Sequence, residues 1–185
     1  MSDLNRFSKA ERRLHWTTVL SVAILAVTGW FIWRKEDDWE INGINVLSQS
    51  HVWVGALLLL VGAGLYLLSR RPKLPAAAVR FNPGQRVSLR LTQLLLGVMT
   101  VSGLALYLRS WIEMSKPVRT VLRQVHFYSG ATLLALVALH VVMVLVVPKN
   151  RGLLRGMLTG RVTRRVALRS SPEWVARLEA EPSGS

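Results

Sequence analysis

The sequence predicts an all-α integral membrane protein whose core is a bundle of four spanning helices. Two observations carry this prediction. Four long runs contain no Asp, Glu, Lys or Arg, and each reaches or nearly reaches the roughly 20 residues that cross a bilayer. These runs are rich in Leu, Val, Ala and Gly and lack the charged face of a soluble bundle. They cover 14–33, 41–69, 91–108 and 124–148.

Each run defines one helix, and we expect helices near 12–34, 49–69, 88–109 and 121–147. We expect 1–185 to form a single membrane domain in which 148–185 is a cytoplasmic tail. The first run follows a basic segment, as the apolar part of a signal peptide does. It is longer than such a segment and contains His15, so we interpret it as a retained helix.

The net charge of +14 is unevenly distributed along the chain. Eighteen of the 24 Lys and Arg residues lie in the N-terminal segment, in the connection between the second and third helices, and after the fourth helix. The positive-inside rule then places both termini and this connection in the cytoplasm. The opposite side carries the acidic stretch from Glu36 to Glu40. Because the basic residues flank apolar spans, we expect contact with anionic lipid and no nucleic acid partner.

The chain has four histidines, His15, His51, His126 and His140, and all lie in or near the apolar runs. An ionisable side chain at membrane depth is a candidate functional residue. Alternating helix directions place His51 and His126 near the outer surface and His15 and His140 near the cytoplasmic surface. The fourteen residues between His126 and His140 put both rings on one helix face, about 21 Å apart.

Two stacked histidine pairs are typical of two b-type haems, each with two axial imidazole ligands. A zinc or copper site would need ligands that converge on one point. Gly55 and Gly130 each follow an outer histidine by four residues. They would let a flat macrocycle approach the helix backbone, or they would serve as small residues in helix contacts.

The absence of cysteine excludes covalent haem attachment through CxxCH, cysteine-ligated iron–sulfur clusters and disulfides on this chain. The sequence also contains no glycine-rich nucleotide motif, no HExxH and no nucleophile–base set. We therefore expect no substrate-oxidising site on this chain. Any iron–sulfur cluster that exchanges electrons with it must belong to a partner.

Three segments carry a resemblance to a known family. They are Arg6-Phe-Ser-Lys-Ala-Glu-Arg-Arg-Leu-His15-Trp16, Asn82-Pro-Gly-Gln85, and a tail pattern that runs from Gly152 through Gly156-Met-Leu-Thr-Gly160 and Arg164-Arg165 to Pro172-Glu-Trp174. With the His126/His140 spacing, they resemble the cytochrome b (gamma) subunit of membrane-bound respiratory formate dehydrogenases. The resemblance implies four helices and two b haems, with His15 paired to His140 and His51 to His126. It also implies a quinone site near the cytoplasmic haem, built from Asn82 and Gly84.

The same resemblance implies the inner membrane of a bacterium as the location, and it implies the partners. An iron–sulfur beta subunit, served by a catalytic alpha subunit with molybdenum or tungsten, would deliver electrons to this chain on the periplasmic side. The chain would pass them to menaquinone or ubiquinone on the cytoplasmic side. Two alternatives stay open: the same role for a hydrogenase, a thiosulfate reductase or another molybdoenzyme, and a haem-free anchor or proton-relay transporter. From the residues alone, Asn82 is also a candidate helix cap.

Overall fold

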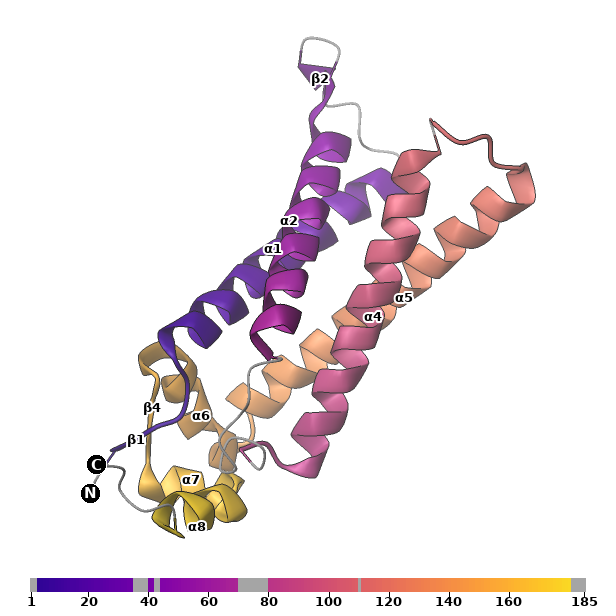
Figure 1. Cartoon of the computed structure of the whole chain (residues 1–185). Coiled ribbons are helices and arrows are strands. Elements are labelled where there is room, and N and C mark those ends of the chain that lie inside the picture. Colours follow the sequence, from indigo (N-terminus) through magenta and orange to yellow (C-terminus); the bar gives the residue numbers. More distant parts are fainter. Residues whose placement is uncertain (1–2, 35–39, 42–43, 70–79, 110, 181–185) are drawn as a thin grey trace. The chain divides into compact units, whose positions relative to one another are not determined.

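The computed structural model describes residues 3–34, 40–41, 44–69, 80–109 and 111–180. Four long helices dominate it (Figure 1). They are α1 (Lys9–Arg34), α2 (Val46–Ser69), α4 (Pro83–Leu108) and α5 (Lys116–Leu145). A two-stranded hairpin of β2 (Glu40–Ile41) and β3 (Ile44–Asn45) directly precedes α2. The basic residues of 70–79 and the acidic residues of 36–38, which carry part of the predicted topology, lie outside the described residues.

Three of these helices, α1, α4 and α5, are long and apolar enough to cross a membrane. Among the described residues, the apolar stretch of α2 is shorter and covers Val46–Val61. The expectation of a helical membrane protein is therefore confirmed. The predicted helix ends are close to the observed ones, but every helix begins a few residues earlier than predicted.

The early starts of α1 and α4 have a local cause that the hydrophobic runs do not reveal. Ser8 accepts a hydrogen bond from the Glu11 backbone N–H (3.2 Å), and the Glu11 carboxylate accepts one from the Ser8 N–H (2.9 Å). Asn82 and Gln85 exchange the same pair of bonds at the start of α4 (2.9 and 3.1 Å). Each pair is a capping box, which satisfies two backbone donors at a helix start. Pro83, at the first helical position, suits the start of α4.

The chain divides into two compact units. The helical unit comprises Leu14–Ser69 and Thr92–Ala135. The terminal unit comprises Met1–Arg13, Arg70–Leu91 and Leu136–Ser185. Parts of α1, α4 and α5 belong to each. Each unit is described by itself below.

The helical unit has the polarity expected of a protein in lipid. Its buried residues, among those described, are Ser21, Thr28, Ser102 and Leu133, so three of four carry hydroxyl groups. Large apolar side chains instead cover its outside, including Leu60 at 69% exposure. In water such a surface would drive aggregation, whereas in a bilayer it faces the acyl chains. Small polar residues at helix contacts are characteristic of membrane bundles.

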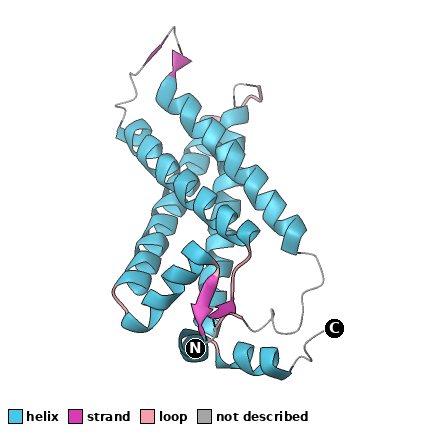
Figure 2. Cartoon of the chain, turned by 90° about the vertical axis from the view of Figure 1, so that its left-hand side faces the viewer, coloured by secondary structure: helices cyan, strands magenta, loops and turns pink. Residues whose placement is uncertain are grey.

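The terminal unit has an ordinary hydrophobic core. Strand β1 (Asp3–Asn5) pairs antiparallel with β4 (Arg161–Thr163), shown in Figure 2 as the magenta strands near the N label. Three helices complete the fold: α6 (Pro148–Thr159), α7 (Arg164–Ser170) and α8 (Pro172–Ala180). The core consists of Val162, Ala167, Trp174 and Val175. The segment that the sequence analysis describes as a tail is thus folded from 148 to 180.

The Arg6 side chain is only 2% exposed and forms three hydrogen bonds within the terminal unit. Its guanidinium donates to the Ser170 hydroxyl (2.9 Å), the Ser171 hydroxyl (3.1 Å) and the Arg80 carbonyl (2.9 Å). Arg80 donates in return to the Arg6 carbonyl (2.9 Å) and forms an ion pair with Glu11. Burial, with the nearby charge of Arg80, lowers the pKa of Arg6 to about 10, so the group remains charged at neutral pH.

Gly160 connects the N-terminal segment to the end of α6. Its φ of 87° lies in the left-handed region that glycine adopts readily. A Cβ here would lie 2.8 Å from the Phe7 carbonyl oxygen. The Gly160 carbonyl accepts bonds from the N–H groups of Arg6 (2.9 Å) and Phe7 (3.1 Å). Gly160 therefore holds the backbone of Arg6 and Phe7 against the end of α6.

We predict that Arg6→Ala destabilises the terminal unit by roughly 3 kcal/mol, because three buried or half-buried acceptors lose a charged donor. Hydrogen exchange of peptides covering 161–175, measured on the detergent-solubilised protein, should show protection reduced by about a hundredfold. Arg155→Ala is the matched control, since its ion pair with Asp3 is exposed and 3.6 Å long and exposed pairs contribute little. Equal exchange in the two variants would contradict a central role for Arg6.

Candidate functional site

Two of the four histidines meet in the helical unit. His51 lies in the second turn of α2 and His126 in the third turn of α5. Their ring centroids are 6.2 Å apart and the ring planes are inclined by 68°. Both side chains are half-buried. The structure thus brings together the pair that the depth argument assigns to the outer surface.

The spacing of these rings fits two axial ligands on one metal. An imidazole nitrogen binds a metal at about 2 Å, and the ring centre lies about 1 Å further along the same line. Two imidazoles on opposite sides of one metal therefore have centroids about 6 Å apart. The observed separation of 6.2 Å is close to this value. Among the described residues, no group of three or more His, Asp and Glu side chains forms a metal site of another kind.

Each histidine of this pair is held by a hydroxyl from the preceding helix. Thr28 of α1 places its Oγ1 2.9 Å from His51 Nδ1. Ser102 of α4 places its Oγ 3.0 Å from His126 Nδ1. Both hydroxyl residues are buried. Because the Nδ1 atoms are engaged in this way, the Nε2 atoms are the candidate metal ligands.

A glycine follows each hydroxyl residue and lies against the same imidazole. A Cβ on Gly29 would be 3.2 Å from His51 Cε1, and one on Gly103 would be 3.0 Å from His126 Cε1. Any side chain at these positions would press on the ring. Glycine therefore lets α1 and α4 approach the two histidines closely enough for the hydroxyl contacts.

The sequence analysis missed these four residues. It singled out Gly55 and Gly130, which face the side chains of Leu25 (4.0 Å) and Met99 (3.2 Å). A signal was present in the sequence: Thr28 precedes His51 by 23 residues, and Ser102 precedes His126 by 24. A hydroxyl–glycine pair at matched distance before each histidine indicates two similar helical hairpins.

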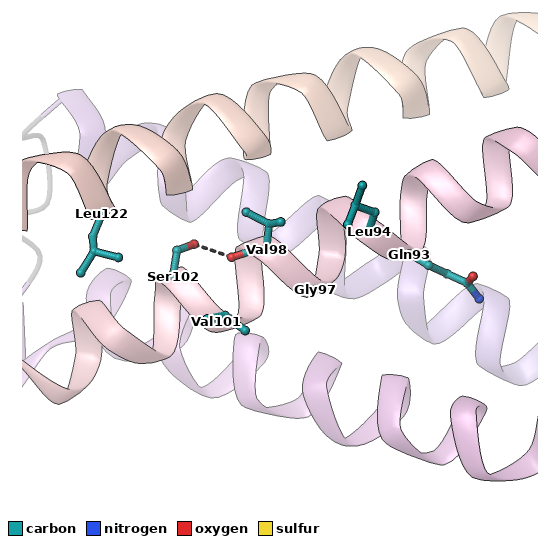
Figure 3. Close-up of a pocket in the computed structure, with 7 residues that line it drawn as sticks. All are labelled: Gln93, Leu94, Gly97, Val98, Val101, Ser102 and Leu122. Carbon is teal, nitrogen blue, oxygen red and sulfur yellow. Dashed lines mark hydrogen bonds between the residues drawn. The ribbon is translucent and has the colours of Figure 1, made fainter.

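An apolar groove of about 490 Å³ adjoins Ser102 on α4. Figure 3 shows the Ser102 hydroxyl bonded to the Val98 carbonyl beside this groove. Only Gln93 and Ser102 contribute polar side chains to the lining. The volume and polarity suit part of a flat apolar ligand or an acyl chain. The lining residues are Gln93, Leu94, Gly97, Val98, Val101, Ser102 and Leu122.

His15 and His140 lie in different units of the structure. His15, in the helical unit, is half-buried and meets Trp16 edge to face with ring centroids 5.4 Å apart. His140, in the terminal unit, is exposed on α5. Since each unit is described by itself, the pairing of His15 with His140 stays a prediction.

Asn82 occupies the N-cap position of α4. Its side-chain oxygen accepts the Gln85 backbone N–H at 2.9 Å, so the cap that the sequence suggested as an alternative role is present. A Cβ on Gly84 would lie 3.6 Å from this oxygen, an ordinary contact. The Asn82 amide NH₂ is the group that this residue would offer to a quinone carbonyl. The assignment of Asn82 and Gly84 to a quinone site stays a prediction.

Comparison with known families finds a match. Residues 6–160 match the family described as prokaryotic cytochrome b561. No curated protein matches the sequence. The match covers most of the chain, including all four long helices and all four histidines. The chain therefore belongs to the prokaryotic cytochrome b561 family and is a membrane haem protein of the b type that serves electron transfer.

Proposed function

We propose that this chain is the di-haem cytochrome b subunit of a formate dehydrogenase complex. It accepts electrons from a periplasmic iron–sulfur beta subunit, whose source is a molybdenum or tungsten alpha subunit. It delivers them to membrane quinone on the cytoplasmic side. The observation that supports this proposal most strongly is the His51/His126 pair, whose ring separation of 6.2 Å suits one shared metal.

His51 and His126 would hold the outer haem, and His15 and His140 the inner one. Haem between two imidazoles supplies reversible one-electron exchange and no open position for substrate. The chain contributes the ligands, a largely apolar surround and the helix spacing. Fourteen residues of α5 separate His126 from His140, so a single continuous helix would provide one ligand to each haem.

The choice of formate dehydrogenase over other donors rests on the resemblance of the tail pattern to that family, and the pattern residues have a structural role in this chain. The pattern residue Trp174 lies in the core of the terminal unit. A Cβ on Gly156 would meet Val162 Cγ1 at 2.7 Å, so this glycine is required for close packing of α6 on β4. A hydrogenase or thiosulfate reductase would use the same haem-binding helices. Identification of the subunits that co-purify with the chain distinguishes these donors.

We predict two low-spin b haems per chain in a pyridine haemochrome assay. His51→Ala and His126→Ala should each remove the same spectral component, because both residues hold one haem. His15→Ala and His140→Ala should remove the other. A single haem per chain, or loss of one component in both His51→Ala and His15→Ala, would contradict the assignment.

We predict that the amide of Asn82 contributes to quinone reduction separately from its capping role. Asn82→Ser retains a hydroxyl that caps α4 but removes the NH₂ donor. Loss of the donor should weaken quinone binding by roughly 1–3 kcal/mol. Reoxidation of donor-reduced haem by quinone should then slow by about 5- to 150-fold, with haem content unchanged. If Asn82→Ser reacts at the wild-type rate and only Asn82→Ala is slow, Asn82 is a cap and nothing more.

We predict cytoplasmic termini from the distribution of basic residues. The chain contains no cysteine, so a single introduced cysteine reports one position. Trp111→Cys, in the exposed connection between α4 and α5, should react with a membrane-impermeant thiol reagent in intact cells. Arg155→Cys, on α6, should react only after the membrane is permeabilised. The reverse pattern would invert the topology and the direction of electron transfer.

A further inference from the structure

The two histidines of the helical unit share one hydrogen-bonding arrangement. Each Nδ1 lies within 3.0 Å of a buried hydroxyl oxygen, Thr28 Oγ1 or Ser102 Oγ. Each hydroxyl also lies close to the carbonyl four residues earlier in its own helix. Thr28 Oγ1 is 2.8 Å from the Ile24 oxygen, and Ser102 Oγ is 2.6 Å from the Val98 oxygen.

The number of protons determines the direction of these bonds. A hydroxyl has one proton to donate, and a carbonyl oxygen can only accept. The Thr28 proton therefore goes to the Ile24 carbonyl, and the Ser102 proton to that of Val98. Both contacts of each hydroxyl are then satisfied only if His51 and His126 donate from Nδ1–H. A neutral imidazole protonated at Nδ1 carries its lone pair on Nε2.

We propose that Thr28 and Ser102 are positioning residues that hold His51 and His126 in the Nδ1–H tautomer and tune their strength as axial ligands. This proposal rests on the proposed function, in which the two histidines hold the outer haem. An acceptor on the far ring nitrogen fixes the ring orientation and raises ligand basicity. A more basic ligand favours the oxidised metal, so both hydroxyls should lower the reduction potential of this haem.

The arrangement explains why a threonine and a serine are buried among apolar helices. A hydroxyl without a partner is costly in a bilayer, and bonding to the preceding helical turn removes much of that cost. The oxygen lone pairs remain available to a donor from another helix. Gly29 and Gly103, the next residue in each case, leave the space that the imidazole needs, with ring carbons 3.2 and 3.0 Å from a would-be Cβ.

The test measures the outer haem in variants that remove one oxygen each. Thr28→Val exchanges the hydroxyl for a methyl group of similar size, and Ser102→Ala removes it. Thr28→Ser and Ser102→Thr retain the hydroxyl and should restore the wild-type behaviour. Thr132→Val is the matched control, because the Thr132 hydroxyl bonds to the Tyr128 carbonyl (2.8 Å) and to no other group among the described residues.

We expect the haem component that His51→Ala abolishes to have a higher reduction potential in Thr28→Val and in Ser102→Ala. A tenfold shift of its one-electron equilibrium corresponds to about 59 mV. The double variant should shift further. Partial loss of this haem in Thr28→Val, with full occupancy in Thr28→Ser, would also support the proposal, because outer-shell partners typically contribute 10- to 100-fold in metal affinity.

Two results would overturn the proposal. One is full occupancy of the outer haem with an unchanged potential in both Thr28→Val and Ser102→Ala. The other is an equal effect in Thr28→Val and Thr28→Ser, which would assign the role to side-chain shape. Failure of the proposed function looks different: His51→Ala would then keep the full haem complement of the wild type, whatever the hydroxyl variants show.

Discussion

A bilayer interior supplies no water, so every polar group in the helical unit must find its partner within the protein. This constraint determines which residues lie inside the unit. Apolar side chains gain little by leaving lipid for a protein interior, so they remain outside. The buried positions instead include Ser21, Thr28 and Ser102. Thr28 and Ser102 bond both to a carbonyl of their own helix and to a histidine. The partners of the two imidazole Nδ1 atoms are thus buried hydroxyls of the unit itself.

The terminal unit has the opposite arrangement, with an apolar core and charged groups at its margin. Its exception is Arg6, a buried cation held by two serine hydroxyls and a carbonyl. A buried charge is tolerated only when hydrogen bonds replace its hydration. Arg6 therefore ties residues from three distant stretches of the chain: the N-terminus, the segment at Arg80 and the serines before α8. Arg80 and Glu11 extend the same network.

Hydrophobic runs predicted the four long helices because length and absence of charge are properties of a single helix. The same runs could not reveal the helix starts, which depend on Ser8 with Glu11 and Asn82 with Gln85. Both capping pairs can be recognised in the sequence, but they lie in charged segments outside the apolar runs. The fold of 148–180 was not predicted, for a different reason. Leu4 of strand β1 packs against its core, and no local sequence pattern predicts a contact between segments so far apart in the chain.

The proximity of His51 and His126 was predicted from helix direction and membrane depth, whereas the groups that orient the two rings were not predicted. Hydroxyls and glycines are common in membrane helices, so neither type stands out. Only the geometry shows that α1 with α2 and α4 with α5 present the same hydroxyl–glycine pair to a histidine. In the proposed function, His51 and His126 bind one iron, and similar hydroxyl partners would give them similar orientation and basicity. The two hairpins supply these partners with different residues, Thr28 and Ser102, and with spacings that differ by one. The proposed haem would therefore account for a repeated arrangement that sequence similarity between the hairpins does not reveal.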